Sequence, residues 1–218
     1  MMVVQRPDPY GPAMRLWVVL SVTAPALTLA AVGLSHPHDL TPESAQWWTT
    51  MHVLLLPIFP LLGMAQWVLV RGPGMLAWGA RLAAFGYAIF YGALDAIAGI
   101  GNGTLVLNGA HAGGGHGMQT TERAPEIGWL FDAGNELGTI GAWSFLVGSV
   151  LTAVVLFQRH GRMALPGGIV LIAASVLFLS SHIYWPTGVF TMLALAVGFG
   201  LLAAAERRPI RTAPLATN

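Results

Sequence analysis

The 218-residue sequence contains neither cysteine nor lysine, and these absences exclude several classes of chemistry. Without cysteine the chain can form no disulfide bond, thiolate nucleophile, iron–sulfur cluster or thiolate-bound zinc. Without lysine it cannot hold retinal or pyridoxal phosphate as a Schiff base. All ten basic residues are arginines and the formal net charge is only +1, so the charge does not favour a nucleic-acid partner.

Charged residues are also scarce. They make up 9% of the sequence, whereas hydrophobic residues make up 55%, and an ordinary soluble domain carries about 25% charged residues. A soluble fold of this size could not bury so much apolar surface, so the composition predicts that a lipid bilayer surrounds much of the chain. A bilayer core about 30 Å thick takes about 20 apolar residues per helix, and six such runs use most of the length.

The apolar runs predict an all-α integral membrane protein, a bundle of six transmembrane helices. The expected spans are residues 16–34, 49–70, 82–101, 129–157, 167–182 and 189–205. They form one transmembrane domain between an N-terminal tail at 1–15 and a C-terminal tail at 206–218. The first run could instead be the apolar segment of a signal peptide, in which case five spans would remain.

The arginines predict the orientation of the bundle. Nine of the ten fall on one side of the six-span arrangement, and only Arg123 falls on the other. The positive-inside rule places those nine, and therefore both termini, in the cytoplasm. Trp47, Trp48, Trp129 and Trp185 lie at the opposite ends of the spans, as aromatic anchors of the outer interface. We therefore expect a multi-pass protein of the plasma (inner) membrane.

Histidines and acids gather at the side expected to face outward. Six of the seven histidines lie there, and Asp95, Asp132 and Glu136 lie within predicted spans. An acidic side chain inside a bilayer costs about 2.5–3.5 kcal/mol or more, so such residues usually face the bundle interior or a water-filled cavity. At 100° per residue, four spans each carry one polar face near the outer end. These faces predict one site formed by His52, Asp95, Asp132, Glu136 and His182.

Two imidazoles with two or three carboxylates suit a divalent metal ion such as Zn²⁺, Mn²⁺ or Fe²⁺. The two histidines could instead be the axial ligands of haem b, although three carboxylates beside a haem would be unusual. Further polar residues on the same faces would hold the ligands or extend a polar path inward: Tyr87, Tyr91, Asn102, Asn135, Thr139 and Ser175.

The loops on the same side add candidate ligands. His36 and His38 form an HxH pair followed by an acid, and His111, His116 and Met118 lie in a glycine-rich segment. Imidazole together with a thioether suits copper, because soft sulfur ligands favour Cu(I). These loops could cover the membrane site or deliver ions to it, or they could simply be mobile and polar.

Three functions remain open at this point. The first is a metal-binding membrane protein, either a small metalloenzyme or a metal handler. The second is a proton-coupled transporter or permease, in which Asp95 and Glu136 titrate and Tyr87 and Tyr91 extend the path. The third is a non-catalytic subunit of a larger membrane complex or a homo-oligomer, for which the GxxxG motif at 134–138 could provide a helix contact. Structural pairing of the polar residues is the alternative to all three.

Overall fold

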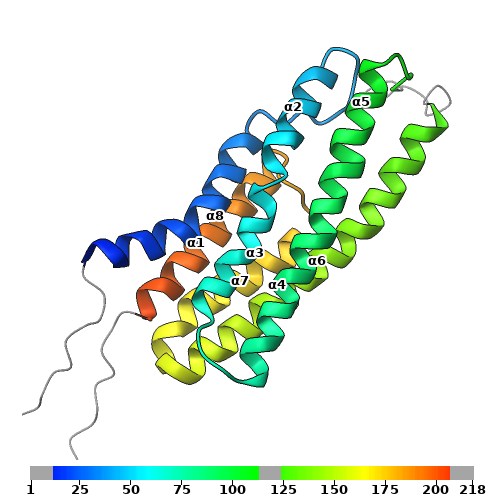
Figure 1. Ribbon diagram of the computed structural model, residues 1–218. Coiled ribbons are helices and arrows are strands. Elements are labelled where there is room, and N and C mark those ends of the chain that lie inside the picture. Colours follow the sequence, from blue (N-terminus) through cyan, green and yellow to red (C-terminus); the bar gives the residue numbers. More distant parts are fainter. Residues whose placement is uncertain (1–11, 113–123, 207–218) are drawn as a thin grey trace, which may run out of the picture.

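The computed structural model describes residues 12–112 and 124–206, and every regular element in these two stretches is helical. The first stretch contains α1 (Pro12–Gly33), α2 (Ala45–Leu55), α3 (Ile58–Leu69), α4 (Met75–Leu94), the π-helix η1 (Asp95–Gly101) and α5 (Asn102–Leu107). The second contains α6 (Pro125–His160), the 3₁₀-helix η3 (Gly161–Ala164), α7 (Leu165–Phe178) and α8 (Thr187–Ala205). The helices pack side by side as an elongated bundle (Figure 1).

Five helical stretches in the described part of the chain are long and apolar enough to cross a membrane. They are Leu16–Gly33, Ala45–Leu69, Met75–Leu107, Pro125–Phe178 and Thr187–Ala205. The fourth stretch contains the fourth predicted span and most of the fifth, and η3 separates α6 from α7 within it. The predicted helical class is therefore confirmed, together with five helices of membrane-spanning length.

Several helix boundaries differ from the expected spans. The second span divides into α2 and α3 around Pro57, because proline has no N–H to donate and its ring disrupts the preceding turn. The third continues past residue 101 to Leu107, through the π-helix η1. α7 ends at Phe178, so His182 lies in the segment that joins α7 to α8 and not in a helix.

Glycines allow α6 to pack closely against α4 and η1. A Cβ atom added at Gly134, Gly138 or Gly141 would lie 2.7–2.8 Å from atoms of Ala98, Leu94 or Tyr91 respectively. Such small residues let two helix backbones approach in a membrane bundle. The GxxxG motif therefore serves a contact within this chain.

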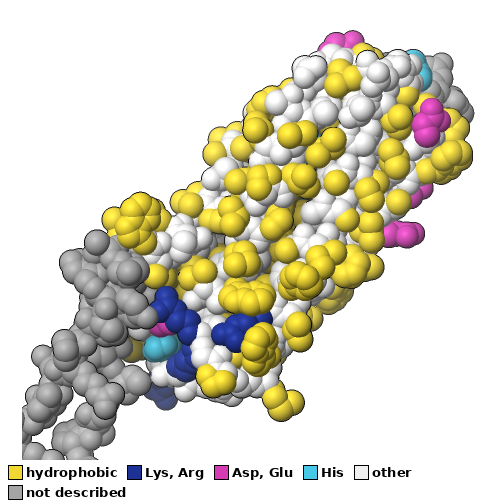
Figure 2. All heavy atoms as spheres, viewed as in Figure 1, with side chains coloured by type: hydrophobic (Ala, Val, Ile, Leu, Met, Phe, Trp, Pro, Cys, Tyr) yellow, Lys and Arg dark blue, Asp and Glu magenta, His cyan; other side chains and the backbone are white. Residues whose placement is uncertain are grey.

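The two ends of the bundle differ in charge. Arginine side chains gather at one end, acidic side chains lie toward the other, and apolar side chains cover much of the surface between them (Figure 2). The start of α1 and the end of α8 lie near the arginine-rich end (Figure 1). Arg81 donates hydrogen bonds there to the carbonyls of Val70 (2.8 Å) and Gly72 (3.0 Å), which fastens the α3–α4 connection.

Candidate metal centre

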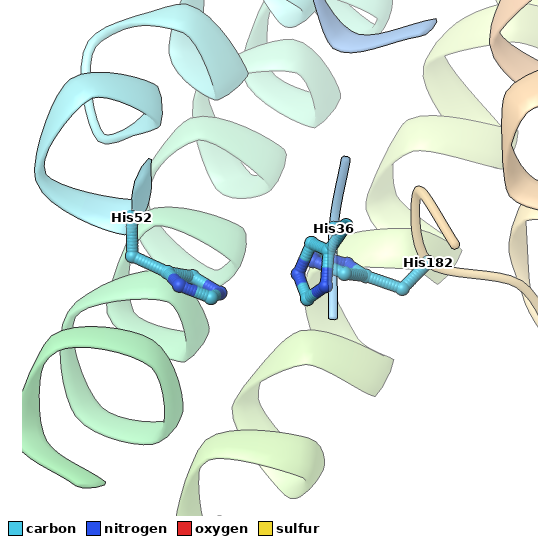
Figure 3. A group of neighbouring side chains, drawn as sticks. All are labelled: His36, His52 and His182. Atoms are coloured by element: carbon cyan, nitrogen blue, oxygen red, sulfur yellow. The ribbon is translucent and has the colours of Figure 1, made fainter. Parts of the chain in front are cut away.

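Three histidines from separate segments meet toward the end of the bundle opposite the arginines. His36 lies in the α1–α2 connection, His52 in α2 and His182 in the α7–α8 connection. One potential ligand nitrogen of each ring lies within 4.8 Å of those of the other two. Figure 3 shows the rings of His52 and His182 extending toward one another from opposite sides, with His36 between them in this view.

The spacing of the rings matches the size of a metal centre. The ring centroids lie 5.2 Å (His36–His52), 5.5 Å (His36–His182) and 6.4 Å (His52–His182) apart. A circle through these centroids has a radius of about 3.3 Å. A zinc–nitrogen bond of about 2.0–2.1 Å, plus about 1.2 Å from nitrogen to ring centre, puts a ligand ring about 3.2 Å from the ion. The three rings therefore lie at the distances at which they could share one ion.

Backbone carbonyls determine which nitrogen is free on two of these rings. Nδ1 of His52 donates to the carbonyl of Trp48, and Nδ1 of His36 donates to the carbonyl of Pro37, both at 2.7 Å. Because a carbonyl oxygen can only accept, Nδ1 carries the hydrogen and Nε2 carries the lone pair in both rings. Nε2 of His36 is buried and has no hydrogen-bond partner. That nitrogen is available to a metal ion.

Tyr91 provides the corresponding partner for the third ring. Its hydroxyl oxygen lies 2.7 Å from Nδ1 of His182. A phenol can accept or donate, and when it accepts from Nδ1, Nε2 of His182 is the free nitrogen, as in the other two rings. Metal-bound histidines almost always have such a partner on the second ring nitrogen, because it fixes the orientation of the ring.

The surroundings of His36 keep its imidazole neutral. Its ring lies among aromatic neighbours, with centroids 4.3 Å from Tyr184 and 5.1 Å from Trp48. Burial lowers the pKa of His36 to about 3, with smaller contributions from His52 and His38, while the hydrogen bond to Pro37 acts in the opposite direction. Histidine binds a metal only in its neutral form, so at neutral pH this ring needs to lose no proton.

A pocket of about 620 Å³ adjoins the histidines, and both His52 and His182 line it. This volume falls within the range of about 300–1,000 Å³ that is typical of small-molecule sites. Its walls come from α2, the junction of α4 with η1, residues 131–142 of α6, and residues 178–188. The short length of α7 contributes to the pocket, because beyond Phe178 an irregular segment replaces a helix as the wall.

Asp95 lines the same pocket. Its side chain is 1% exposed, and neither carboxylate oxygen has a hydrogen-bond partner. It is the first residue of η1, and π-helical turns occur frequently at functional sites. One turn earlier, Tyr91 bonds His182, and one turn later, Gly99 lies against His52, where an added Cβ would come within 2.2 Å of the ring. Asp95 therefore lies between helix positions that contact two of the three histidines.

The structure does not bring Asp132 and Glu136 to the histidines. Both side chains are exposed on α6, and the cluster of potential ligands contains neither. The reason is the way in which α6 is rotated about its own axis. Gly134 faces η1 at the close helix contact, and a residue two positions away along an α-helix points to nearly the opposite side. The expected group of two imidazoles and three carboxylates is thus replaced by three imidazoles with one carboxylate beside their pocket.

Other polar residues predicted for the site fall into two groups. Asn135 and Thr139 line the pocket from α6, and both are exposed. Tyr87, Asn102 and Ser175 are buried in the bundle. The hydroxyl of Tyr87 and both amide atoms of Asn102 lack hydrogen-bond partners, whereas the hydroxyl of Ser175 is hydrogen-bonded to that of Ser149 at 2.8 Å.

The predicted loop ligands also separate. His36 joins the three-histidine cluster, while His38 is exposed and stacks on Tyr184, with ring centroids 5.8 Å apart. His111 is exposed and is not a member of the cluster. His116 and Met118 lie outside the described residues.

Three further features of the site were not predicted. Trp48 was expected only as an interfacial anchor, yet its Nε1 donates to the carbonyl of Gly99 at 3.0 Å and fastens α2 to η1. Tyr184 packs against His36 and lines the pocket. Its position two residues after His182 was the only sequence signal for it. The π-helix has no marker in the sequence beyond the glycines at 99 and 101.

Comparison of the chain with protein-family models, with curated proteins and with solved structures finds no match. No similarity therefore assigns an activity to the three histidines. The function is therefore inferred from the donor atoms of the three histidines, from the hydrogen-bond partners of these histidines and from the adjoining pocket.

Proposed function

We propose that this protein is a membrane metalloenzyme that binds one divalent transition metal through Nε2 of His36, His52 and His182. The observation that carries the proposal is the meeting of three imidazoles whose Nδ1 atoms already have hydrogen-bond partners. Zinc fits best, because three neutral histidines with a fourth, open position are a recurrent catalytic zinc site. The open position would face the pocket that His52 and His182 line.

Manganese and haem, both considered from the sequence, fit less well. Manganese prefers carboxylate and carbonyl oxygens, and Asp132 and Glu136 are exposed away from the cluster. A haem b bound by His52 and His182 would lie between their two rings and extend to all sides of the line that joins them. The ring of His36 occupies that space, because its centroid lies 5.2 and 5.5 Å from theirs.

Elemental analysis of the detergent-purified protein tests this proposal. We expect about one zinc ion per chain, and loss of that zinc in His36→Ala, His52→Ala and His182→Ala. His38→Ala is the matched control, because this exposed histidine belongs to the same loop and lies outside the cluster. Substoichiometric metal that is unchanged in a His52→Ala/His182→Ala double variant would contradict the proposal.

We further propose that the chain crosses the inner membrane six times, with both termini in the cytoplasm and the metal centre near the outer face. Because the start of α1 and the end of α8 lie at one end of the bundle, an even number of crossings fits (Figure 1). α6 and α7 would then be separate crossings joined at η3. Along α6, the exposed Glu136 and the half-buried Arg159 lie about 34 Å apart at 1.5 Å per residue, close to the thickness of a bilayer core.

Buried polar atoms toward the arginine-rich end favour a second candidate function, proton movement. Three residues that lie closer to the arginine-rich end than Asp95 each have a buried side-chain atom without a hydrogen-bond partner. They are Tyr87, Gln66 and Thr152. Water molecules that satisfied these atoms would form a path through the bundle. Proton flux into liposomes measures this activity directly, and flux that is indifferent to Asp95→Asn would exclude it.

A further inference from the structure

We propose that the pocket is the substrate site of a hydrolytic reaction, in which Asp95 takes a proton from metal-bound water and the substrate is an uncharged, lipid-like ester or amide. This inference rests on the proposed metal site and names its chemistry. Three observations carry it: the position of Asp95, the unpartnered carboxylate oxygens and the lining of the pocket.

Asp95 lies on the wall of the pocket that two of the proposed ligands also line. Tyr91 and Gly99 lie four residues before and four residues after Asp95. Tyr91 is hydrogen-bonded to His182, and Gly99 contacts His52. Asp95 and these two histidines also line one pocket. An ion held by the histidines and the carboxylate of Asp95 would therefore border the same pocket, where one water molecule could lie between them.

The carboxylate also lacks the partners that burial demands. A buried carboxylate without hydrogen bonds or a compensating charge is costly, yet both oxygens of Asp95 are unpartnered. A divalent ion supplies the compensating charge, and a water molecule on its fourth position supplies the hydrogen-bond donor. Of the described residues that line the pocket, Asp95 is the one acid, so no other carboxylate there competes for this role.

The reaction balances with these groups alone. Asp95 accepts one proton from the metal-bound water and leaves a metal-bound hydroxide, which such ions stabilise near neutral pH. The hydroxide oxygen attacks the carbonyl carbon of the substrate and forms the new C–O bond. The bond to the alcohol or amine then breaks, and Asp95 returns its proton to that leaving group. One water molecule is consumed, and a carboxylic acid and an alcohol or amine are released.

The lining indicates the class of substrate. Most of the side chains that could touch a ligand are aromatic or aliphatic, and they include Trp48, Leu94, Ala98, Phe131, Ala142 and Phe178. No arginine occurs among the described lining residues, so no side chain there carries a fixed positive charge that would pair with an anionic headgroup. Gly138 and Ala142 lie in the apolar part of α6 that follows Glu136, while Thr139 between them is exposed. The pocket therefore reaches the side of the bundle at lipid level, where an amphiphile could enter.

Hydrolysis of p-nitrophenyl esters by the zinc-loaded protein in nanodiscs tests the reaction. We expect the decanoate to be cleaved at least tenfold faster than the acetate. Asp95→Asn should retain one zinc per chain and lose at least 100-fold in rate, because a positioned proton acceptor contributes about 10²–10⁴-fold. Glu126→Gln is the control, since it makes a comparable change at an exposed acid in the first turn of α6.

Hydroxamates provide a second readout that needs no turnover, because they bind a metal ion through the position that the substrate would take. Decanohydroxamic acid should raise the melting temperature of the zinc protein more than acetohydroxamic acid does. Thr139→Phe should reduce this difference by narrowing the pocket, whereas Ile140→Phe, at an exposed neighbour outside the lining, should not.

The outcomes separate the two proposals. Full esterase activity in a zinc-loaded Asp95→Asn variant overturns the role of Asp95. A wild-type protein with one zinc ion, but with neither esterase activity nor a preference for the long hydroxamate, overturns the substrate assignment and leaves the metal site standing. Absence of zinc from the wild-type protein removes the metal site and this inference with it.

Discussion

The imidazoles of the candidate centre each depend on a neighbour that holds Nδ1. Two of these neighbours are backbone carbonyls, which a substitution cannot remove. The third is the hydroxyl of Tyr91, which bonds His182. Among the three ligands, His182 is thus the one whose outer partner can be deleted without changing the ligand itself.

Tyr91→Phe should weaken zinc binding by about 10–100-fold, because the loss of such a partner leaves the ring less well oriented. Competition against a chromogenic zinc chelator would measure the change. Tyr87→Phe is the matched control, one helical turn away, because the hydroxyl of Tyr87 has no partner in the structure. Equal zinc affinity in the Tyr91→Phe and wild-type proteins would show that the hydroxyl does not position the ligand.

The π-helix η1 is the element that joins the site to the rest of the bundle. It lies between α4 and α5 and packs against both α2 and α6. Gly99 leaves the space that the ring of His52 fills, and its carbonyl accepts the hydrogen bond from Trp48. A side chain at this position would push directly on a proposed ligand.

Gly99→Ala should therefore lower zinc affinity at least tenfold, since its Cβ would lie 2.2–2.9 Å from atoms of His52. Zinc titration and a thermal melt of the metal-free protein would measure the two effects. Gly92→Ala is the control in the same helical stretch. Apart from its chain neighbours and the nearby backbone of its own helix, no atom lies within 4 Å of the added Cβ. The substitution should therefore leave zinc affinity unchanged and stabilise the helix by up to about 1 kcal/mol.

Helices α3, α6 and α7 are connected by a buried hydrogen-bonded group. Nε2 of Gln66 donates to the hydroxyl of Ser149 at 3.0 Å and to the carbonyl of Phe145 at 3.1 Å. The hydroxyls of Ser149 and Ser175 lie 2.8 Å apart, and Ser149 is the donor, because the hydrogen of Ser175 goes to the carbonyl of Leu171 at 2.7 Å. Interhelical hydrogen bonds in membrane proteins stabilise by about 0.6 kcal/mol each on average. The group should thus add modestly to the free energy of unfolding.

Ser149→Ala removes the hydroxyl that takes part in two of these bonds and should destabilise the protein by about 1 kcal/mol. Reversible unfolding in SDS–detergent mixtures would measure the difference. Ser144→Ala on the same helix is the control, because that hydroxyl bonds only the carbonyl of Ile140 in its own helix. A larger loss of stability for Ser144→Ala would contradict the role assigned to the group.

The whole molecule has an arginine-rich end and an end that carries the histidine centre, so its orientation can be tested with single cysteines. The natural chain has none, which makes it a ready background for labelling. Glu43→Cys lies in the exposed α1–α2 connection and Arg162→Cys in the exposed turn at η3.

In intact cells, a membrane-impermeant maleimide should label Glu43→Cys at once, and Arg162→Cys only after the membrane is opened. This result follows from the positive-inside rule and from six crossings. Labelling of both cysteines in intact cells would contradict the six-span arrangement, and the reverse pattern would invert the orientation.

Part of the site could be predicted because it depends on local pattern. His52 and Asp95 are buried, and together with His182 they line the pocket. The sequence predicted this location, because a polar residue in an apolar span usually faces the bundle interior or a cavity. Asp132 and Glu136 met the same criterion and yet face outward. Helical periodicity shows which residues share a face, but it does not show which neighbour that face meets.

By itself, the sequence determined the helical class, the apolar stretches, the asymmetry of the arginines and the exclusion of thiolate and Schiff-base chemistry. These properties depend on composition and on patterns within one helix. Only the tertiary structure decided the membership of the metal centre. It brought His36 into the cluster along the path of a loop, and it turned the acids of α6 away because glycines on that helix pack against α4 and η1. Such contacts join residues far apart in the chain, so no local pattern contains them.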